Sequence, residues 1–342
     1  MNTWNQFLSE QGAGAAQALT TAQLGSGFVA PISELGLIAV HGEDAASFLH
    51  NQLTNDVEHL DAQHARLAGY CTPKGRLMAS FLMWRNETTI FLQLSRAIQP
   101  ALQKRLQMFV LRAKAKLADA GEDAATAVTL GLGGAAAGAA LAAWFPALPT
   151  AAYAKVDNEH GTLIRVADAF GAPRYQWITS SETAQSVWLQ LASRLAKGGD
   201  DAWNLSEIHA GVPRIDAATQ DQFVPQMVNF ELLGGVNFKK GCYPGQEIVA
   251  RSQYLGKLKR RTTLVSIADA AAKAGDEVFA ASDPGQPAGM IVNAAPNGAG
   301  GVDALVELKL AAIEEAAVRL ASPEGAPLTF LSMPYVLDPL DL

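Results

Sequence analysis

The stretch that says most about this chain runs from Asn237 to Arg251 and reads Asn-Phe-Lys-Lys-Gly-Cys-Tyr-Pro-Gly-Gln-Glu-Ile-Val-Ala-Arg. Pro244-Gly245 predicts the centre of a type II turn, because proline fixes φ and glycine accepts a positive φ. Gly241 permits a close approach of the backbone to a neighbouring group. We expect a helix to begin at Gln246.

Cys242 lies directly after two lysines and just before this predicted helix. Nearby cations and a helix N-terminus both favour the thiolate form of a cysteine. The ordinary alternative is a surface hairpin with a solvated basic edge and an unreactive cysteine. Because Lys-Gly-Cys, Pro-Gly and Gln-Glu occur together, we favour a functional thiol at Cys242 with Lys240 beside it.

Basic residues gather in and after this stretch, with Glu247 almost the only opposing charge. In a chain of net charge −7, such a cluster predicts an anion site. The acidic balance of the whole chain argues against nucleic-acid binding by charge alone, although a local basic patch can still contact a nucleic acid. The cluster consists of Lys239, Lys240, Arg251, Lys257, Lys259, Arg260 and Arg261.

Length and composition indicate a globular protein of two or three domains, with 342 residues of which 49% are hydrophobic and 17% charged. The two cysteines, Cys71 and Cys242, are too few for a disulfide framework, a zinc site or a four-cysteine cluster, so no metal site is predicted. Neither a signal peptide nor a membrane span is visible. We expect a soluble protein of the reducing cytoplasm.

The pattern of elements predicts an α+β protein. Strands are expected at 35–40, 67–71 and 77–84, the last two forming a hairpin about the turn 72–75, and a helix is expected within 3–20. Further strands are expected at 151–156, 161–167 and 174–179. Residues 1–256 form one α+β region with a subdomain break near 118–150, and short strands separated by Gly, Pro and Asp predict a small β-barrel over 257–342.

Other motifs carry less weight. Residues 131–136 match the G-x-G-x-x-A dinucleotide fingerprint, with Asp157 at the ribose position, but such matches arise by composition in a Gly/Ala-rich tract. The six histidines show no metal-binding spacing, and no nucleophile elbow or P-loop occurs. Trp203 by itself is most often a core residue. Asp216, Gln222, Pro225 and Gln226 either line a cleft or satisfy turn backbones.

The segment Lys240–Glu247, followed by Ala250-Arg251, resembles the signature of the YgfZ family. The similarity extends through Trp203, Ala210–Pro213, Ile215–Ala217, Gln222–Gln226, Asn229 and Leu233–Gly235, and nearer the N-terminus through Phe48–Leu49, Gln52–Val57 and Cys71–Arg76. Members of this family are folate-binding proteins linked to iron–sulfur cluster assembly or repair and to tRNA modification. They share a fold with the aminomethyltransferase (T-protein) of the glycine cleavage system.

The resemblance implies a fold and a set of site residues. It implies a two-subdomain folate-binding α+β region and a C-terminal β-barrel around a central cavity, with tetrahydrofolate as the cofactor. Cys242 matches the family's functionally required cysteine, flanked by Lys240, and Trp203 matches its folate-contacting tryptophan. The residues assigned to cofactor binding are Trp203, Asp216, Gln226, Asn229, Tyr243, Gln246, Glu247 and Arg251.

Two departures from the family pattern bear on the reaction. Where some members have a second tryptophan before the first strand, this chain has Leu35, so one stacking surface is missing. Where the aminomethyltransferases have a pair of aspartates after the Lys-Gly turn, this chain has Ala79 and Ser80. A carboxylate is expected to interact with the folate amine in one-carbon transfer, so we predict a shared fold without that reaction.

Three functional hypotheses follow. The first is a tetrahydrofolate-binding accessory protein that supports iron–sulfur cluster assembly or repair, with Cys242 as one soft ligand and with iron–sulfur proteins or assembly factors as partners. The second is a tetrahydrofolate-dependent one-carbon transferase that uses a carboxylate such as Asp216. The third is a module in which the basic stretch 239–261 contacts tRNA. None of the three involves a membrane.

Overall fold

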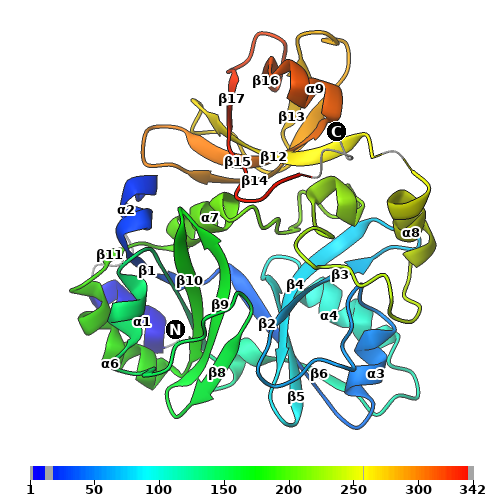
Figure 1. Ribbon diagram of the computed structural model, residues 1–342. Helices are drawn as coiled ribbons and strands as arrows, with labels where there is room; N and C mark the ends of the chain where they lie inside the picture. The colour runs from blue at the N-terminus through cyan, green and yellow to red at the C-terminus, as the bar shows by residue number, and fades with distance from the viewer. Residues whose placement is uncertain (1–2, 12–17, 257, 338–342) are drawn as a thin grey trace.

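The computed structural model describes residues 3–11, 18–256 and 258–337. Two sheets stand side by side with helices on their outer faces, and a barrel-like sheet lies across one end of both (Figure 1). The α+β class and the small C-terminal β-barrel predicted from the sequence are confirmed.

The first sheet has five antiparallel strands in the order β3-β4-β5-β2-β6. Helices α3 (Ala45–His50) and α4 (Gln99–Met108) cover one of its faces and bury residues such as Phe48, Leu49, Leu102 and Leu106. The opposite face belongs to the central core, so most β4 residues are buried on both faces. The strands are β2 (Leu35–His41), β3 (Arg66–Cys71), β4 (Leu77–Arg85), β5 (Thr89–Ser95) and β6 (Lys116–Asp119), followed by the 3-10 helix Ala120–Glu122.

The second sheet has six strands in the order β11-β1-β7-β10-β9-β8, all antiparallel except the β1–β11 pair. Its first strand, β1, precedes the whole first sheet in the chain. Helices α1 (Thr3–Glu10), α5 (Ala137–Leu141) and α6 (Ser181–Ala192) share a core with its outer face. The strands are β1 (Phe28–Ile32), β7 (Val128–Gly133), β8 (Lys155–Asn158), β9 (Gly161–Ala169), β10 (Ala172–Thr179) and β11 (Ala196–Lys197); α2 (Thr21–Ser26) precedes β1.

The C-terminal sheet is antiparallel in the order β16-β13-β14-β15-β12-β17, and a bridge between Arg319 and Pro327 brings its two edges together. Closing a sheet in this way protects its edge strands from pairing with other chains. Its elements are β12 (Arg260–Ile267), β13 (Glu277–Ala280), β14 (Gly289–Pro296), β15 (Val302–Lys309), α9 (Leu310–Glu315), β16 (Val318–Leu320) and β17 (Leu328–Leu331).

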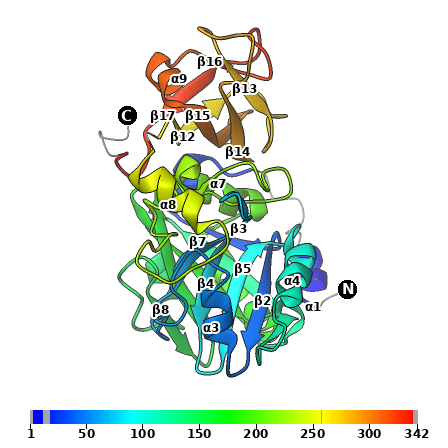
Figure 2. The ribbon, with the colours of Figure 1, turned by 90° about the vertical axis from the view of Figure 1, so that its right-hand side faces the viewer.

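A connecting segment joins the three sheets. It contains α7 (Asp200–His209), the 3-10 helix Pro225–Val228 and α8 (Gln246–Tyr254), which lie between the barrel and the two other sheets (Figures 1 and 2). His209 Nε2 lies 2.7 Å from Asp303 Oδ2 of β15, and the Asn293 side chain of β14 bonds both backbone groups of Arg214. The central core also runs without a break into the barrel strands. The barrel is therefore packed onto the rest of the molecule.

Some sequence expectations are corrected in detail. The predicted strand 151–156 begins only at Lys155, because Tyr153 has a left-handed backbone (φ 66°) that ends extended structure. The predicted helix within 3–20 covers Thr3–Glu10, and residues 12–17 lie outside the described part of the chain. None of the described helices combines the length and apolar character needed to cross a membrane.

The G-x-G-x-x-A match has a packing explanation. Strand β7, which contains Gly131, is antiparallel to both of its neighbours, whereas the dinucleotide fold requires a parallel sheet. A Cβ atom at Gly131 would lie 2.3 Å from Cε3 of Trp203. The glycine therefore makes room for the tryptophan of α7 against the sheet.

We predict that the buried ion pair between Arg261 and Glu231, whose side chains are 1% and 4% exposed, holds the barrel to the connecting segment. Glu231→Leu leaves a buried guanidinium without its carboxylate and should lower the free energy of unfolding by about 3 kcal/mol, measured by urea denaturation. The double variant Glu231→Leu/Arg261→Met should recover much of this loss. Equal losses in the single and double variants would show that the ion pair has no such role.

Candidate functional site

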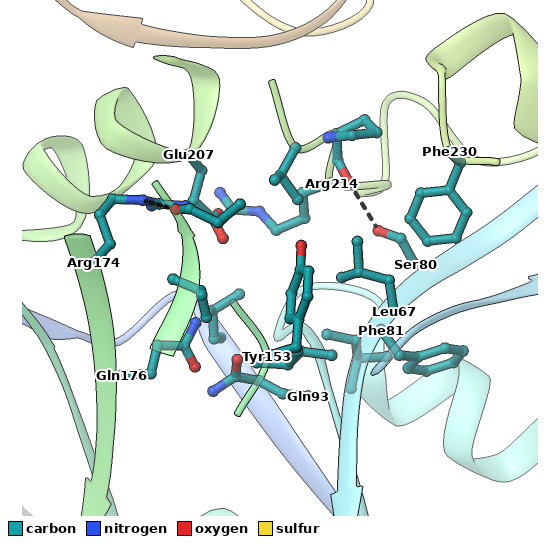
Figure 3. Close-up of a pocket in the computed structure, with 17 residues that line it drawn as sticks. Leu67, Ser80, Phe81, Gln93, Tyr153, Arg174, Gln176, Glu207, Arg214 and Phe230 are labelled. Carbon is teal, nitrogen blue, oxygen red and sulfur yellow. Dashed lines mark hydrogen bonds and ion pairs between the residues drawn. The ribbon is translucent and has the colours of Figure 1, made fainter. Parts of the chain in front are cut away.

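A central cavity lies where the two N-terminal sheets face each other beneath the connecting segment, and its empty space of about 500 Å³ includes the part that is open to solvent. Figure 3 shows Arg174 and Gln176 entering it from β10 and Ser80 from the opposite sheet. Arg174 and Gln176 are two positions apart on one strand and therefore share a face. The polar residues that line it are Ser80, Gln93, Tyr153, Arg174, Gln176, Glu207 and Arg214; apolar residues such as Leu35, Leu67 and Phe230 complete the wall.

Arg174 provides a fixed positive charge in this wall. Its side chain is fully buried, Nε donates to Ala167 O at 2.9 Å and Nη1 donates to Ser206 Oγ at 2.8 Å. The guanidinium carbon lies 4.7 Å from the ring centroid of Trp203. Burial lowers the pKa of Arg174 to about 10, so the group stays charged at neutral pH.

Glu207 provides the negative charge. It lies on α7 and pairs with Arg214 of the connecting segment at 3.2 Å. Its carboxylate also stabilises the charged form of Arg174. The cavity thus holds one carboxylate between two guanidinium groups, an arrangement suited to a ligand with both donors and acceptors.

Three buried polar atoms of the residues that line the cavity have no hydrogen-bond partner among the described residues: the Tyr153 hydroxyl, Gln176 Oε1 and Arg214 Nε. The tyrosine ring points into the cavity between Glu207 and Ser80 (Figure 3). Burial raises the pKa of Tyr153 above its usual value, so the hydroxyl remains a donor at physiological pH. Unpaired buried polar groups are costly and call for water or a ligand.

Trp203 lies behind this wall. The side chain comes from α7, is completely buried and stacks on the Arg174 guanidinium. It is not one of the residues that line the cavity. Its effect on a ligand in the cavity would therefore act through the position of Arg174. Leu35, in contrast, does line the cavity at the position where the sequence predicted a missing aromatic surface.

Ser80 and Ala79, which replace the aspartates expected in an aminomethyltransferase, differ in position. Ser80 lines the cavity, where its Oγ accepts a hydrogen bond from Ile215 N at 3.0 Å. Ala79 is fully buried in the core beneath α3 and α4. The serine therefore ties β4 to the connecting segment and brings no charge into the cavity.

The remaining predicted cofactor ligands lie elsewhere. Asp216 lines a neighbouring cavity that shares Glu207, Val212 and Arg214 with the central one, and its Oδ1 accepts a hydrogen bond from Ala218 N at 3.0 Å. Gln226 is buried and donates to Val249 O of α8 at 2.8 Å, and Asn229 is buried and donates to Thr262 O of β12 at 2.8 Å. Both amides join parts of the fold.

The stretch that contains Cys242 forms a second site at the start of α8. Gly245 has φ 80° and ψ 1°, and Gln246 N donates to Tyr243 O, so the predicted type II turn is present. This turn packs against the turn after β3: a Cβ atom at Gly245 would lie 2.3 Å from Thr72 O, and one at Gly75 would lie 2.9 Å from Ile248 Cβ. Two glycines thus let two turns interlock.

Cys242 is exposed, whereas burial raises the pKa of Cys71 to about 12 and leaves that thiol inert. Lys240 is held beside Cys242: Nζ donates to Leu53 O at 2.8 Å and to His50 O, and lies 5.0 Å from the ring of Tyr243. Burial lowers the pKa of Lys240 to about 8. No residue of the Lys240–Arg251 stretch lines the central cavity, so the structure presents a cavity and a separate surface thiol.

Only some residues of the predicted basic cluster are exposed at the surface. Arg260 of β12 pairs with Glu307 of β15 at 2.8 Å within the barrel sheet, and Arg261 pairs with Glu231 of the connecting segment. Lys257 lies outside the described residues. Lys239, Arg251 and Lys259 are exposed, as is Glu247, and Gln246 Nε2 donates to Gly241 O at 3.5 Å. The sequence expectation of a single anion site over 239–261 is therefore corrected.

Sequence reasoning missed the cavity's own polar residues, Tyr153, Arg174, Gln176, Glu207 and Arg214. A signal was present on β10, where Arg174 and Gln176 alternate with Tyr175 and Trp177 in an otherwise apolar strand. Polar residues on one face of a fully buried strand point to a polar cavity.

The chain is similar to known proteins both in sequence and in structure. A tRNA-modifying protein YgfZ of Edwardsiella ictaluri is 36% identical over 225 residues, which are 65% of this chain and 66% of that protein. Proteins of the same name from Yersinia pestis and Klebsiella pneumoniae are 33% and 34% identical, over 67% and 72% of this chain and 68% and 74% of their own lengths. The chain thus matches about two thirds to three quarters of these relatives. No protein-family model matches it.

Among solved structures, the glycine cleavage system aminomethyltransferase T of Bartonella henselae superposes with a TM-score of 0.72. The match covers 96% of this chain and 89% of that protein, with 18% sequence identity. The aminomethyltransferase-like fold expected from the sequence is thereby confirmed.

We predict that Gly245→Ala destabilises the Cys242 site. The alanine would adopt an unfavourable positive φ and place its Cβ against Thr72 O, so the loss should exceed about 2 kcal/mol in the free energy of unfolding. Gly241→Ala is the matched control, because its Cβ would lie 3.6 Å from His50 Nε2 in ordinary contact. Thermal unfolding of both variants checks this, and equal melting temperatures would contradict the interlocked turns.

Proposed function

Because the chain belongs to the YgfZ family, we propose that it is a tetrahydrofolate-binding accessory protein that supports iron–sulfur cluster assembly or repair and, through it, tRNA modification. The observation that carries the proposal is the central cavity, whose Tyr153 hydroxyl and Gln176 Oε1 have no partner among the described residues. The relatives bear the name of tRNA-modifying proteins, and the fold is that of an aminomethyltransferase.

The residues of the cavity fit a reduced pterin. A pterin ring is flat and presents an edge with both donors and acceptors. Glu207 would accept hydrogen bonds from its amino group, and Arg174 and Tyr153 would donate to its oxygen and nitrogen atoms. Apolar side chains such as Leu67 and Phe230 supply the desolvated walls that such sites need. With Leu35 in place of an aromatic residue, one stacking contact is absent.

The cavity's side chains argue against one-carbon transfer. Bound tetrahydrofolate can accept a one-carbon unit at its ring nitrogens. At β4 this chain offers a neutral serine, whose Oγ is already bonded to Ile215 N, in place of a carboxylate. Glu207, the carboxylate that lines the cavity, lies on α7 and not on β4. Folate bound here would therefore be a bound ligand and not a one-carbon acceptor.

Cys242 would act at a separate surface. A single thiol cannot hold a cluster alone, and the described residues contain no group of three His, Cys, Asp or Glu side chains able to bind a metal ion. We take the cluster to be cargo whose other ligands come from a partner. Lys240, fixed by two backbone carbonyls, would hold a positive charge near the sulfur.

Tyr153→Phe tests the cavity. It removes one hydroxyl and keeps the ring, so the dissociation constant for tetrahydrofolate should rise about fivefold to tenfold, the value of one hydrogen bond. Calorimetric titration measures this, with Tyr254→Phe on the exposed end of α8 as the control. Unchanged affinity in Tyr153→Phe, or absence of binding by the wild-type chain, contradicts a folate site in this cavity.

Cys242→Ser tests the thiol, because it removes the soft ligand and keeps the size. In cells that depend on this protein, iron–sulfur enzyme activity should fall to the level of the deletion, while the purified variant keeps its folate affinity. Normal enzyme activity in the variant would exclude the thiol role.

The alternative of a one-carbon transferase is supported by one observation, the position of Asp216 in the adjoining cavity. Formation of methylene-tetrahydrofolate from an aminomethyl donor, with its loss in Asp216→Asn, would establish that reaction instead.

A further inference from the structure

An apolar surface without a role in either site lies at the C-terminal end of α4. We call residues 104–116, which run from the last turns of α4 into β6, the α4 tip. Nine large apolar side chains are exposed among the described residues, and three of them fall within four consecutive positions here: Met108 (62%), Phe109 (45%) and Leu111 (87%). Grouped exposed apolar residues mark interaction sites more often than scattered ones do.

The backbone of Leu111 makes this exposure more informative. Its φ of 45° lies in the left-handed region, which costs a non-glycine residue about 1 kcal/mol or more. Glycine or asparagine would form this turn with less strain. In the chain alone, the leucine thus carries backbone strain and buries almost nothing in return. Packing of the Leu111 side chain against another molecule would offset this backbone strain.

The charges of the α4 tip are all positive. Between positions 104 and 116 there are five basic residues and no acidic one. Arg105 donates to the Tyr70 hydroxyl at 3.1 Å, and Lys114 pairs with Glu43 at 2.7 Å. The other three, Lys104, Arg112 and Lys116, are exposed and form no ion pair with a described residue. In a chain of net charge −7, this surface stands out.

We propose that the α4 tip is a docking surface for an acidic segment of a partner protein that carries apolar side chains. An apolar centre of Met and Phe with a charged rim that includes Arg is the composition of protein interfaces. Nucleic-acid surfaces pair basic residues with several rings that stack on bases, and here Phe109 is the one aromatic residue within 104–116, beside the non-aromatic Met108 and Leu111. The charge of the rim requires an acidic partner.

This surface is distinct from the two sites described above. No residue of the α4 tip lines the central cavity, and α4 covers the face of the first sheet that is turned away from it. The elements α3, α4 and α8 lie on the right-hand side of Figure 1, and Figure 2, which views that side, draws α4 and α8 well apart. The inference does not depend on folate or on the Cys242 thiol.

The test uses the full chain and three short labelled helical peptides, followed by fluorescence anisotropy. One peptide has Leu at positions i, i+3, i+4 and i+7 among Glu residues, the second has Ser in place of Leu, and the third has Lys in place of Glu. The acidic apolar peptide should bind at least about tenfold more tightly than either control. Its affinity should fall as salt rises.

Variants assign the binding to the α4 tip. Leu111→Gly should weaken the acidic apolar peptide about tenfold while raising the melting temperature, because glycine relieves the strained turn. A merely structural leucine would lower the melting temperature instead. Lys104→Glu/Arg112→Glu should also weaken binding about tenfold. The matched controls, Leu189→Ser and Lys197→Glu/Lys273→Glu, change exposed residues elsewhere and should leave the affinity unchanged.

Three results would overturn the proposal. The first is equal affinity for all three peptides, and the second is an equal loss of affinity in the control variants. The third is tighter binding of an RNA hairpin or a phosphatidylserine vesicle than of the acidic apolar peptide, with that binding lost in Lys104→Glu/Arg112→Glu. The last result would assign the surface to a nucleic acid or a lipid.

Discussion

A guanidinium without access to water must find its hydrogen-bond acceptors and its counter-charge within the protein, and at Arg174 this requirement fixes the centre of the molecule. The acceptors are Ala167 O of β9 and Ser206 Oγ of α7, the ring of Trp203 lies against its face, and Glu207 supplies the opposing charge. Three of these four groups come from α7. The same requirement explains Gly131, since a side chain there would displace Trp203 and with it the support of the arginine.

The molecule separates two kinds of chemistry. The cavity between the sheets carries opposite charges and leaves the Tyr153 hydroxyl and Gln176 Oε1 without a hydrogen-bond partner among the described residues. The Cys242 thiol is exposed on a turn locked to the turn after β3, and its neighbouring ammonium is held by the carbonyls of His50 and Leu53. The connecting segment lines the cavity with Arg214 and Phe230, and its Gln226 donates to Val249 O of α8. A ligand in the cavity and a partner at the thiol would therefore contact the same connecting segment.

Much of the fold could be predicted from the chain because the signals were local. Pro244-Gly245 specifies its turn through φ alone, and the short strands after Arg260 specify a barrel through their spacing. The replacement of aspartate by Ser80 and of tryptophan by Leu35 could also be recognised, and both residues do line the cavity. In the structure, the predicted ligands Gln226, Asn229 and Trp203 contact other parts of the fold. The sequence could not distinguish the two roles, because a polar or aromatic residue in a matching motif is the same whether it contacts a ligand or a neighbouring strand.

The elements, the turn that presents Cys242 and the family of the chain can be read from its amino-acid order, since these depend on neighbours along the chain. The pairing of Arg260 with Glu307 and of Arg261 with Glu231 depends on how the chain folds in space. The fold also brings Tyr153, Arg174, Glu207 and Arg214 around one cavity from three separate segments, the last two residues from the connecting segment. Such groupings depend on which faces of the sheets meet. The free energy of burying each charge depends on ionic and hydrogen-bond partners that lie far away in the sequence.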